Sequence, residues 1–283
     1  MLQQTRVTSV IPYYERFLDR FPSVLSLAES PLDDLLAAWA GMGYYSRARN
    51  LHAAARMIAA AGNFPTTYQS IRALPGVGDY TAAAVSSIAF NLPHAAVDGN
   101  VRRVLSRVTA SSENIQTTAS LALDSAHPGE FNQALMELGA TVCLPRQPQC
   151  ACCPIADFCR AREQGRQSEF PVKTPKPEIT AVTKDLLIVQ RRGKLLCWRR
   201  PSGRMSGFWE LPGTEHLPNA LRLLKLGTFR HSIMNIRYHV TVYSAVAPSP
   251  APHGLIWIPL ADLAVVPLST TTRKALRLRD SAV

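Results

Sequence analysis

The sequence predicts a protein in two parts, a mainly α-helical N-terminal region followed by an α+β domain. Three observations predict this division. Apolar residues recur with helical spacing as far as residue 141, a proline-rich basic stretch follows near residue 170, and strand-like runs separated by turn signals come after it. With 283 residues, of which 47% are hydrophobic, the chain is long enough to bury two separate cores.

The helical region is predicted to span residues 1–163, the linker 164–183 and the C-terminal domain 184–283. The linker contains Phe-Pro-Val-Lys-Thr-Pro-Lys-Pro at 170–177, whose prolines stiffen the chain and whose lysines keep it solvated. Neither part contains an internal repeat or a low-complexity tract.

Helix signals recur along the N-terminal region. Ser30 and Pro31 supply a cap and a proline at the first helical position, and the apolar residues of 32–39 then follow with helical spacing. Apolar spacing also predicts helices at 7–20, 46–61, 80–90, 100–108, 120–126 and 131–141.

The C-terminal part contains strand-like runs at 186–189, 195–198 and 238–246. The segment Arg191-Arg192-Gly193-Lys194 between the first two runs predicts a hairpin turn. Cys197 lies in one of these runs and is expected in the core.

A glycine-rich turn and a carboxylate follow one another at 74–98. Gly76 and Gly78, with Val77 between them, permit a tight turn whose backbone can approach a ligand, and the next helix start offers N–H groups to a phosphate. An ordinary turn between two helices is the alternative. Asp98 stands at the start of a further helix, where it can act as an N-cap, as a catalytic carboxylate or as both.

The charge balance favours a polyanionic partner. The chain has 31 Lys+Arg against 20 Asp+Glu and a formal net charge of +11, and its pI is about 9.7. Solvated helix faces would explain any single group of arginines. The arginines nevertheless gather around the motifs, at Arg47, Arg49, Arg102, Arg103, Arg107, Arg146, Arg160, Arg162 and Arg166.

Five of the six cysteines fall within 143–159, a density that favours metal binding over disulfides. Four of them form the pattern C-x6-C-x2-C-x5-C, and four thiolates at this spacing can converge on one centre: Cys143, Cys150, Cys153 and Cys159. Cys152 is then spare. Zinc also accepts four thiolates, so the spacing alone leaves zinc and iron–sulfur open.

The N-terminus shows no basic and then apolar leader, since Met1 is followed by Leu2-Gln3-Gln4-Thr5, and no apolar run is long enough to span a membrane. We therefore expect a cytoplasmic protein without a membrane partner.

These motifs resemble one known family. The segments LQQT, GMGYYSRARNLH, LPGVGDYTA, VDGNVRRVLSR and FNQALMELGA, with the four cysteines, resemble adenine DNA glycosylases of the MutY type, members of the helix-hairpin-helix base-excision superfamily. The resemblance covers nearly the whole chain. It implies a glycosylase region with a helix-hairpin-helix at about 74–90 and an iron–sulfur module at about 143–159, followed by a MutT/Nudix-like domain that recognises the lesion.

The resemblance implies removal of adenine mispaired with 8-oxoguanine or guanine in double-stranded DNA by a monomer, after the adenine is flipped out. Endonuclease III shares the hairpin and the cysteines. Bifunctional relatives, however, carry a Schiff-base lysine where this chain has Tyr80, which predicts a monofunctional enzyme rather than a pyrimidine-lesion glycosylase.

Several residue roles follow from the resemblance alone. Asp98 would stabilise positive charge on the sugar, Tyr80 and Asn100 would line the site, and Glu137 would either support Asn100 or lie on a helix surface. The four cysteines would hold a four-iron four-sulfur cluster. The residues expected to contact DNA are Gln3, Gln4, Tyr44, Arg47, Gly76, Val77, Gly78 and Arg146. Simpler interpretations remain for Gln4, as a polar residue at a helix start, and for Tyr44, as a packed aromatic.

The chain departs from the family at Met1. The family has a glutamate two positions before this methionine, which protonates the leaving base. We expect that the sequence is N-terminally truncated and begins at an internal methionine of a longer protein, because Tyr80, Asp98 and Asn100 are all kept. The alternative is a catalytically impaired protein that binds the lesion.

A second departure lies in the lesion-reading loop, where Ile233-Met234-Asn235 replaces the family's Phe-Ser-His. Ser232 or Asn235 would then hydrogen-bond 8-oxoguanine. The sequence lacks the repeated glutamates of a Nudix pyrophosphatase, so this domain is expected to read a lesion, or merely to clamp DNA, rather than to hydrolyse nucleotides.

Overall fold

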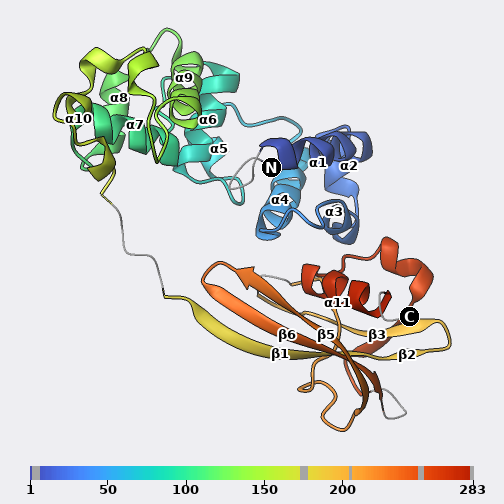
Figure 1. Cartoon of the computed structure of the whole chain (residues 1–283). Helices are drawn as coiled ribbons and strands as arrows, with labels where there is room; N and C mark the ends of the chain where they lie inside the picture. The colour runs from blue at the N-terminus through green and yellow to red at the C-terminus, as the bar shows by residue number, and fades with distance from the viewer. Residues whose placement is uncertain (2–6, 173–177, 204–205, 248–251, 281–283) are drawn as a thin grey trace. The chain divides into compact units, whose positions relative to one another are not determined.

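The computed structural model describes residues 1, 7–172, 178–203, 206–247 and 252–280 (Figure 1). The chain forms two compact units. Met1–Ala60 and Pro177–Val283 make up the first, and Ala61–Lys176 make up the second. The domain boundary predicted at 164–183 stays a prediction, and part of that linker, 173–177, lies outside the described residues.

The first unit begins with helices α1 (Val7–Arg20), α2 (Val24–Glu29), α3 (Leu32–Ala38) and α4 (Ser46–Ala61). The bounds of α1 and α4 are those predicted. The cap predicted at Ser30 is wrong, since Pro31 occupies the N-cap position of α3 and Ser30 ends α2 by donating its hydroxyl to the carbonyl of Leu27. A proline before the first helical residue still directs the chain into α3, because its φ is fixed.

A residue from the C-terminal half completes the core of these helices. Phe208, from the loop after β3 (Lys194–Arg199), is fully buried together with Leu35 and Leu36, and its ring centroid lies 4.1 Å from that of Tyr45. Around it, Arg49 donates to the carbonyl of Ser206 at 2.8 Å. An ion pair between Arg199 and Asp33 adds a second polar contact.

Two small sheets and a helix make the rest of this unit. In the first sheet, β6 (Ile236–Val246) pairs in parallel with β1 (Thr180–Ile188) and antiparallel with β5 (Leu221–Ile233). In the second, β3 pairs antiparallel with β2 (Gln190–Arg191), β4 (Trp209–Glu210) and β7 (Leu255–Pro259). A short 3-10 helix, Leu260–Ala264, and then α11 (Thr270–Asp280) follow. Figure 1 shows α11 lying along the strands, where Ala275 packs with Leu186 and Val242.

The predicted strands are present, and each begins before its predicted start, whereas β1 ends at Ile188, one residue before its predicted end. The turn at 191–194 joins β2 to β3, with Arg192 and Gly193 both at positive φ. Cys197 is fully buried, as expected, and burial raises the pKa of its thiol to about 12. Strands β5 and β7 were not predicted. The burial along β5 does not alternate regularly, so a period-two pattern is weak in its sequence.

The second unit is helical. Its elements are α5 (Tyr68–Arg72), α6 (Asp79–Phe90), α7 (Gly99–Thr109), α8 (Ile115–Ala122), α9 (Pro128–Thr141) and α10 (Arg160–Glu163), with 3-10 turns at Cys150–Cys152, Ala156–Phe158 and Gln167–Glu169. The helix predicted at 120–126 is wrong, because α8 begins and ends earlier. Asp124 accepts from the backbone N–H of Ala126 at 2.9 Å and makes a turn that leads into α9.

Helix α9 packs closely on α6 and α7, and two of its glycines permit this (Figure 1). A Cβ at Gly129 would lie 2.8 Å from the carbonyl oxygen of Ser87 in α6. A Cβ at Gly139 would lie 2.6 Å from the Cβ of Asn100 in α7 and 3.1 Å from its backbone. Both positions therefore need a residue without a side chain.

Within the ranges described above, the structure contains no helix that is long and apolar enough to cross a membrane.

Replacing Gly139 by alanine is expected to force α9 away from α7, because backbone atoms of Asn100 cannot yield as a flexible side chain does. We expect a loss of about 1–3 kcal/mol in the free energy of unfolding, measured by urea denaturation. Gly99→Ala is the control, since a Cβ there meets no described atom within 4 Å. Equal stabilities of the two variants would contradict the packing argument.

Candidate functional site

The glycine turn predicted at 74–78 joins α5 to α6. Gly76 has a φ of +76°, and the N–H of Val77 donates to the carbonyl of Leu74 at 3.1 Å, which closes the turn. Gly78 is the N-cap of α6, and in the described structure no side chain caps it. No described atom would lie within 4 Å of a Cβ at Gly78, so the turn leaves room for a ligand beside the start of α6. A phosphate can reach such a helix start.

Asp98 is the N-cap of α7, and its carboxylate is held by two donors. Oδ1 accepts from the backbone N–H of Val101 at 2.7 Å, and Oδ2 accepts from the side-chain amide of Asn100 at 3.2 Å. The side chain is partly exposed. The N-cap function is therefore present, and the carboxylate is fixed in one orientation without being sealed from solvent.

Tyr80, in the first turn of α6, lies near this carboxylate. Burial, and then the charge of Asp98, raise the pKa of its phenol above the ordinary value, so the hydroxyl stays protonated at neutral pH. Its hydroxyl lies 3.4 Å from the sulfur of Met136 in α9. The structure thus brings Tyr80, Asp98 and Asn100 together, while their catalytic roles remain predictions.

Asn132 in α9 positions the segment that leads to Asp98, and sequence reasoning missed it. It is 1% exposed. Its amide nitrogen donates to the carbonyl of His94 and to the hydroxyl of Ser87, and its oxygen accepts from the backbone N–H of Ala96. A buried asparagine with all these partners holds an otherwise extended segment in place. The sequence did offer one indication of this role, since Asn132 is a polar residue among apolar neighbours in a predicted helix.

Arg103 holds Asn100 from the other side. Its guanidinium donates to Asn100 Oδ1 at 2.9 Å, to the carbonyl of Gly139 at 2.7 Å and to the carbonyl of Cys143 at 2.7 Å.

The structure separates the other residues expected near Asn100 by their burial. Glu137 is exposed, so it lies on a helix surface, which is one of the two roles expected for it. Arg103 and Arg107 are 9% and 2% exposed. A polyanionic partner and a solvated helix face are the two explanations that the sequence offers for this group of arginines, and neither fits these two buried side chains, whereas Arg102 is exposed.

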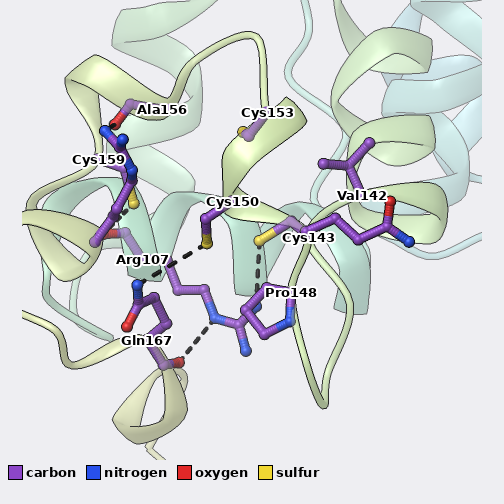
Figure 2. Close-up of a pocket in the computed structure, with 11 residues that line it drawn as sticks. Arg107, Val142, Cys143, Pro148, Cys150, Cys153, Ala156, Cys159 and Gln167 are labelled. Atoms are coloured by element: carbon purple, nitrogen blue, oxygen red, sulfur yellow. Dashed lines mark hydrogen bonds between the residues drawn. The ribbon is translucent and has the colours of Figure 1, made fainter.

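The four predicted cysteine ligands line one pocket, which is partly open to solvent. Figure 2 shows Arg107 and Gln167 reaching the sulfurs of Cys143 and Cys150, at 3.3 Å and 3.9 Å. The pocket is lined by Arg107, Val142, Cys143, Pro148, Gln149, Cys150, Cys153, Ala156, Cys159, Arg162 and Gln167. Cys152 does not line it and is exposed, which agrees with its interpretation as the spare cysteine.

Arg107 fastens the loops around this pocket. Besides Cys143, its guanidinium donates to the carbonyls of Leu144 at 2.8 Å and Gln167 at 2.9 Å. It thus joins α7 to both ends of the cysteine segment. The sequence did not reveal this role, because charge alone does not show whether an arginine is buried.

The donor set of the pocket fits a group that binds several thiolates. All four cysteines are free thiols. In the described part of the chain, no group of three or more His, Cys, Asp or Glu side chains has the geometry to hold a metal ion. All four cysteines nevertheless line the same pocket, and four thiolates suit either a zinc ion or an iron–sulfur cluster.

In the first unit, Tyr44 follows a turn made by Gly41 and Gly43 and has a φ of +47°. The residue is 48% exposed, so it is not the packed aromatic of the simpler interpretation. The Arg47 guanidinium lies over it at 5.4 Å and donates to the carbonyl of Met1 at 2.9 Å. Gln3 and Gln4 lie outside the described residues. Arg146, in the second unit, is exposed on the loop between Cys143 and Cys150.

The lesion-reading residues predicted in the C-terminal part lie at the β5–β6 turn. Ser232 is exposed at the end of β5, whereas the side-chain amide of Asn235 donates to the carbonyl of Glu178 at 3.2 Å. Met234 has a φ of +55° and is 69% exposed, so it forms the tip. Sequence reasoning assigned Met234 no separate role, because nothing in the sequence indicated that this residue adopts a positive φ at the tip of the turn.

Two family models match the chain. Residues 1–124 match the HhH-GPD superfamily of base excision DNA repair proteins, and residues 186–278 match the NUDIX domain. The fold expected from the sequence, a helix-hairpin-helix glycosylase region followed by a Nudix-like α+β domain, is confirmed.

Solved structures agree with the helical part. A thermostable thymine-DNA glycosylase is 29% identical over 58% of this chain and 80% of its own, with a TM-score of 0.54. An endonuclease III in a non-covalent DNA complex is 26% identical over 57% of this chain and 79% of its own, with a TM-score of 0.51.

Relatives found by sequence similarity are more specific. The adenine DNA glycosylase of Mus musculus is 32% identical across 99% of this chain and 70% of its own length. That of Schizosaccharomyces pombe is 42% identical across 58% of this chain and 38% of its own. The motifs around Asp98, the hairpin and the cysteine pocket lie inside a similarity that extends over both parts of the sequence, and the chain belongs to the adenine DNA glycosylase family.

Proposed function

We propose that this protein is a monofunctional DNA glycosylase of base excision repair, which hydrolyses the N-glycosidic bond of adenine mispaired with 8-oxoguanine or guanine in double-stranded DNA. The observation that carries the proposal is the carboxylate of Asp98, fixed by Val101 and Asn100 beside Tyr80. The whole-chain similarity to adenine DNA glycosylases supports the substrate.

Asp98 would act through its charge. Cleavage of the glycosidic bond builds positive charge on the deoxyribose, and a carboxylate that is already oriented stabilises that charge without reorganising. The two donors on Asp98 keep the carboxylate in one position. They also leave it partly exposed, so a nucleotide turned out of the duplex can approach it.

Tyr80 supports a monofunctional reaction. A lyase that cuts the strand needs an amine to form a Schiff base with the sugar, and a protonated phenol cannot form one. The raised pKa of Tyr80 keeps this group neutral beside Asp98, where it would orient the nucleotide rather than attack it.

DNA would bind through phosphate and wedge contacts. The open start of α6 at Gly76, Val77 and Gly78 would receive a backbone phosphate, and Arg146 would add a cation. Tyr44 and Arg47, with Gln3 and Gln4, would contact the duplex near the mispair. The net charge of +11 supports such a partner.

The cysteine pocket would hold a four-iron four-sulfur cluster bound by Cys143, Cys150, Cys153 and Cys159. Such a group supplies structural support and a redox-sensitive centre rather than hydrolytic chemistry. Arg107 and Gln167, which contact two of the sulfurs, would stabilise the charge of the bound thiolates.

The C-terminal domain would read the base opposite adenine through the β5–β6 turn. Ser232 is free to approach a base edge, whereas Asn235 is held by Glu178. Clamping of DNA without reading a base is the alternative role of this domain.

Two other functions are less well supported. A catalytically impaired lesion-binding protein would need Asp98 only as the cap of α7, which does not explain why Asn100 and Tyr80 stand beside its carboxylate. An endonuclease III-like pyrimidine glycosylase would need an amine where Tyr80 stands.

Asp98→Asn tests the reaction. Asparagine still caps α7 but has no charge, so we expect the rate of adenine release to fall by on the order of a hundredfold to a thousandfold while binding of the mispair is kept. The assay measures free adenine and strand breaks on a duplex with adenine opposite 8-oxoguanine. It uses the natural gene product, so that any residues preceding Met1 are included.

Asp124→Asn is the control for the Asp98 variant, because Asp124 also accepts backbone N–H groups in the second unit. It should release adenine at the wild-type rate. Undiminished release by Asp98→Asn would refute the role of Asp98, and strand cleavage by the wild type would revive the pyrimidine glycosylase.

Cys153→Ser should abolish binding of the cluster, because one of four thiolate ligands is lost, whereas Cys152→Ser should leave it unchanged. Iron and acid-labile sulfide are measured on the purified proteins, with zinc measured alongside. Stoichiometric zinc without sulfide in the wild type would show that the pocket holds zinc instead.

Ser232→Ala should reduce the preference for 8-oxoguanine over guanine opposite adenine by about three- to tenfold, the effect of one hydrogen bond. The preference is measured as the ratio of the dissociation constants for duplexes with guanine and with 8-oxoguanine opposite adenine. Thr228→Ala removes a hydroxyl from the same strand farther from the turn, and it should change neither constant. Equal effects of the two substitutions on the preference would indicate that the C-terminal domain clamps DNA without reading a base.

A further inference from the structure

An acidic side chain stands where the proposed function places a DNA phosphate. Asp79 is the first residue of α6, directly after Gly78, and its side chain is 80% exposed. The amides of a helix start attract anions, and a fixed carboxylate beside them repels a second anion. A strongly basic chain thus carries a negative charge at its proposed phosphate contact.

Arg72, at the end of α5, holds this carboxylate across the turn. Its Nε donates to Asp79 Oδ1 at 2.6 Å, and its Nη1 donates to the carbonyl of Val77 at 2.9 Å. The hydroxyl of Tyr68 donates to the same carboxylate oxygen at 3.4 Å. The guanidinium therefore lies at the mouth of the turn, beside the amides that would receive the phosphate.

The pair is exposed to solvent on both sides, since the side chain of Arg72 is 46% exposed. Exposed ion pairs stabilise a protein weakly. A DNA phosphodiester offers the guanidinium two oxygens that share one negative charge, as a carboxylate does, so it can accept the same pair of N–H bonds. A DNA phosphate at the turn is thus able to replace Asp79 as the partner of Arg72.

We propose that Arg72 is a further phosphate ligand of this protein and that Asp79 competes with DNA for it. In the free protein Arg72 is paired with Asp79, and on the duplex it turns to a backbone phosphate. The proposal rests on the proposed function, because it needs the turn at 76–78 to contact DNA.

The competition lowers the affinity for every duplex equally, because phosphate contacts carry no sequence information. Asp79 then limits how tightly the protein holds undamaged DNA and leaves its preference for the mispair unchanged. A purely structural role for Asp79 is the rival explanation, since a carboxylate in the first turn also stabilises its helix.

The experiment measures dissociation constants by fluorescence anisotropy as a function of salt, for an undamaged duplex and for one with adenine opposite 8-oxoguanine. Asp79→Asn should raise the affinity for both about three- to tenfold at about 50 mM salt, and should steepen the dependence of log K on log salt by about one. In an Arg72→Gln background the same substitution should give little gain.

Asp34→Asn is the matched control. Asp34 in α3 forms an exposed ion pair with Arg20 in α1, with 2.8 Å between Oδ2 and Nη2, and its replacement changes the net charge by the same amount. It should leave both dissociation constants unchanged. Thermal unfolding of each variant checks that the helices remain intact.

A lower melting temperature for Asp79→Asn with unaltered DNA affinity would establish the structural role and overturn the proposal. So would an undiminished gain in the Arg72→Gln background, since Asp79 would then act by simple repulsion. Adenine release is assayed in parallel. A wild-type protein that binds both duplexes but releases no adenine would refute the proposed reaction while leaving the competition standing.

Discussion

The guanidinium of Arg103 is the interaction on which the helical unit depends. It lies between α7, α9 and the cysteine segment, and it donates to an acceptor on each: Asn100, Gly139 and Cys143. A buried cation is tolerated only where such acceptors surround it. Arg103 reaches the carbonyl of Gly139 only because this residue has no side chain that would hold α9 away from α7. Close helix packing and the placement of Asn100 are therefore one constraint.

Arg107 repeats this arrangement one turn later on α7, where it fastens the cysteine segment. One helix thus carries the carboxylate at its start and the supports of the pocket along its length. Asp98 is oriented by contacts that exist without DNA, so the energy of binding need not be spent on arranging it. Asn132 serves the same end from α9, by fixing the backbone that enters α7.

Features set by local chemistry could be predicted from the sequence. The cap at Asp98 follows from its place before a helix, and the pocket follows from the spacing of its thiols. The functions of Arg103 and Arg107 could not be predicted, because a basic residue on a helix looks the same in sequence whether it faces DNA or the interior. Strand β5 was missed because bulges and exposed leucines disturb its alternation. Asn132 was missed because its partners lie more than thirty-five residues away.

Phe208 places a condition on how the chain assembles. The helices α3 and α4 leave the ribosome long before this residue, yet their core contains its ring beside Tyr45. Until residue 208 has emerged, the core that contains Leu35, Leu36 and Trp39 lacks one of its members, so the nascent N-terminal helices expose the apolar surface that Phe208 later covers. A fragment that ends at the linker would keep that surface exposed permanently, and its solubility would report the missing phenyl ring rather than any defect in its own helices.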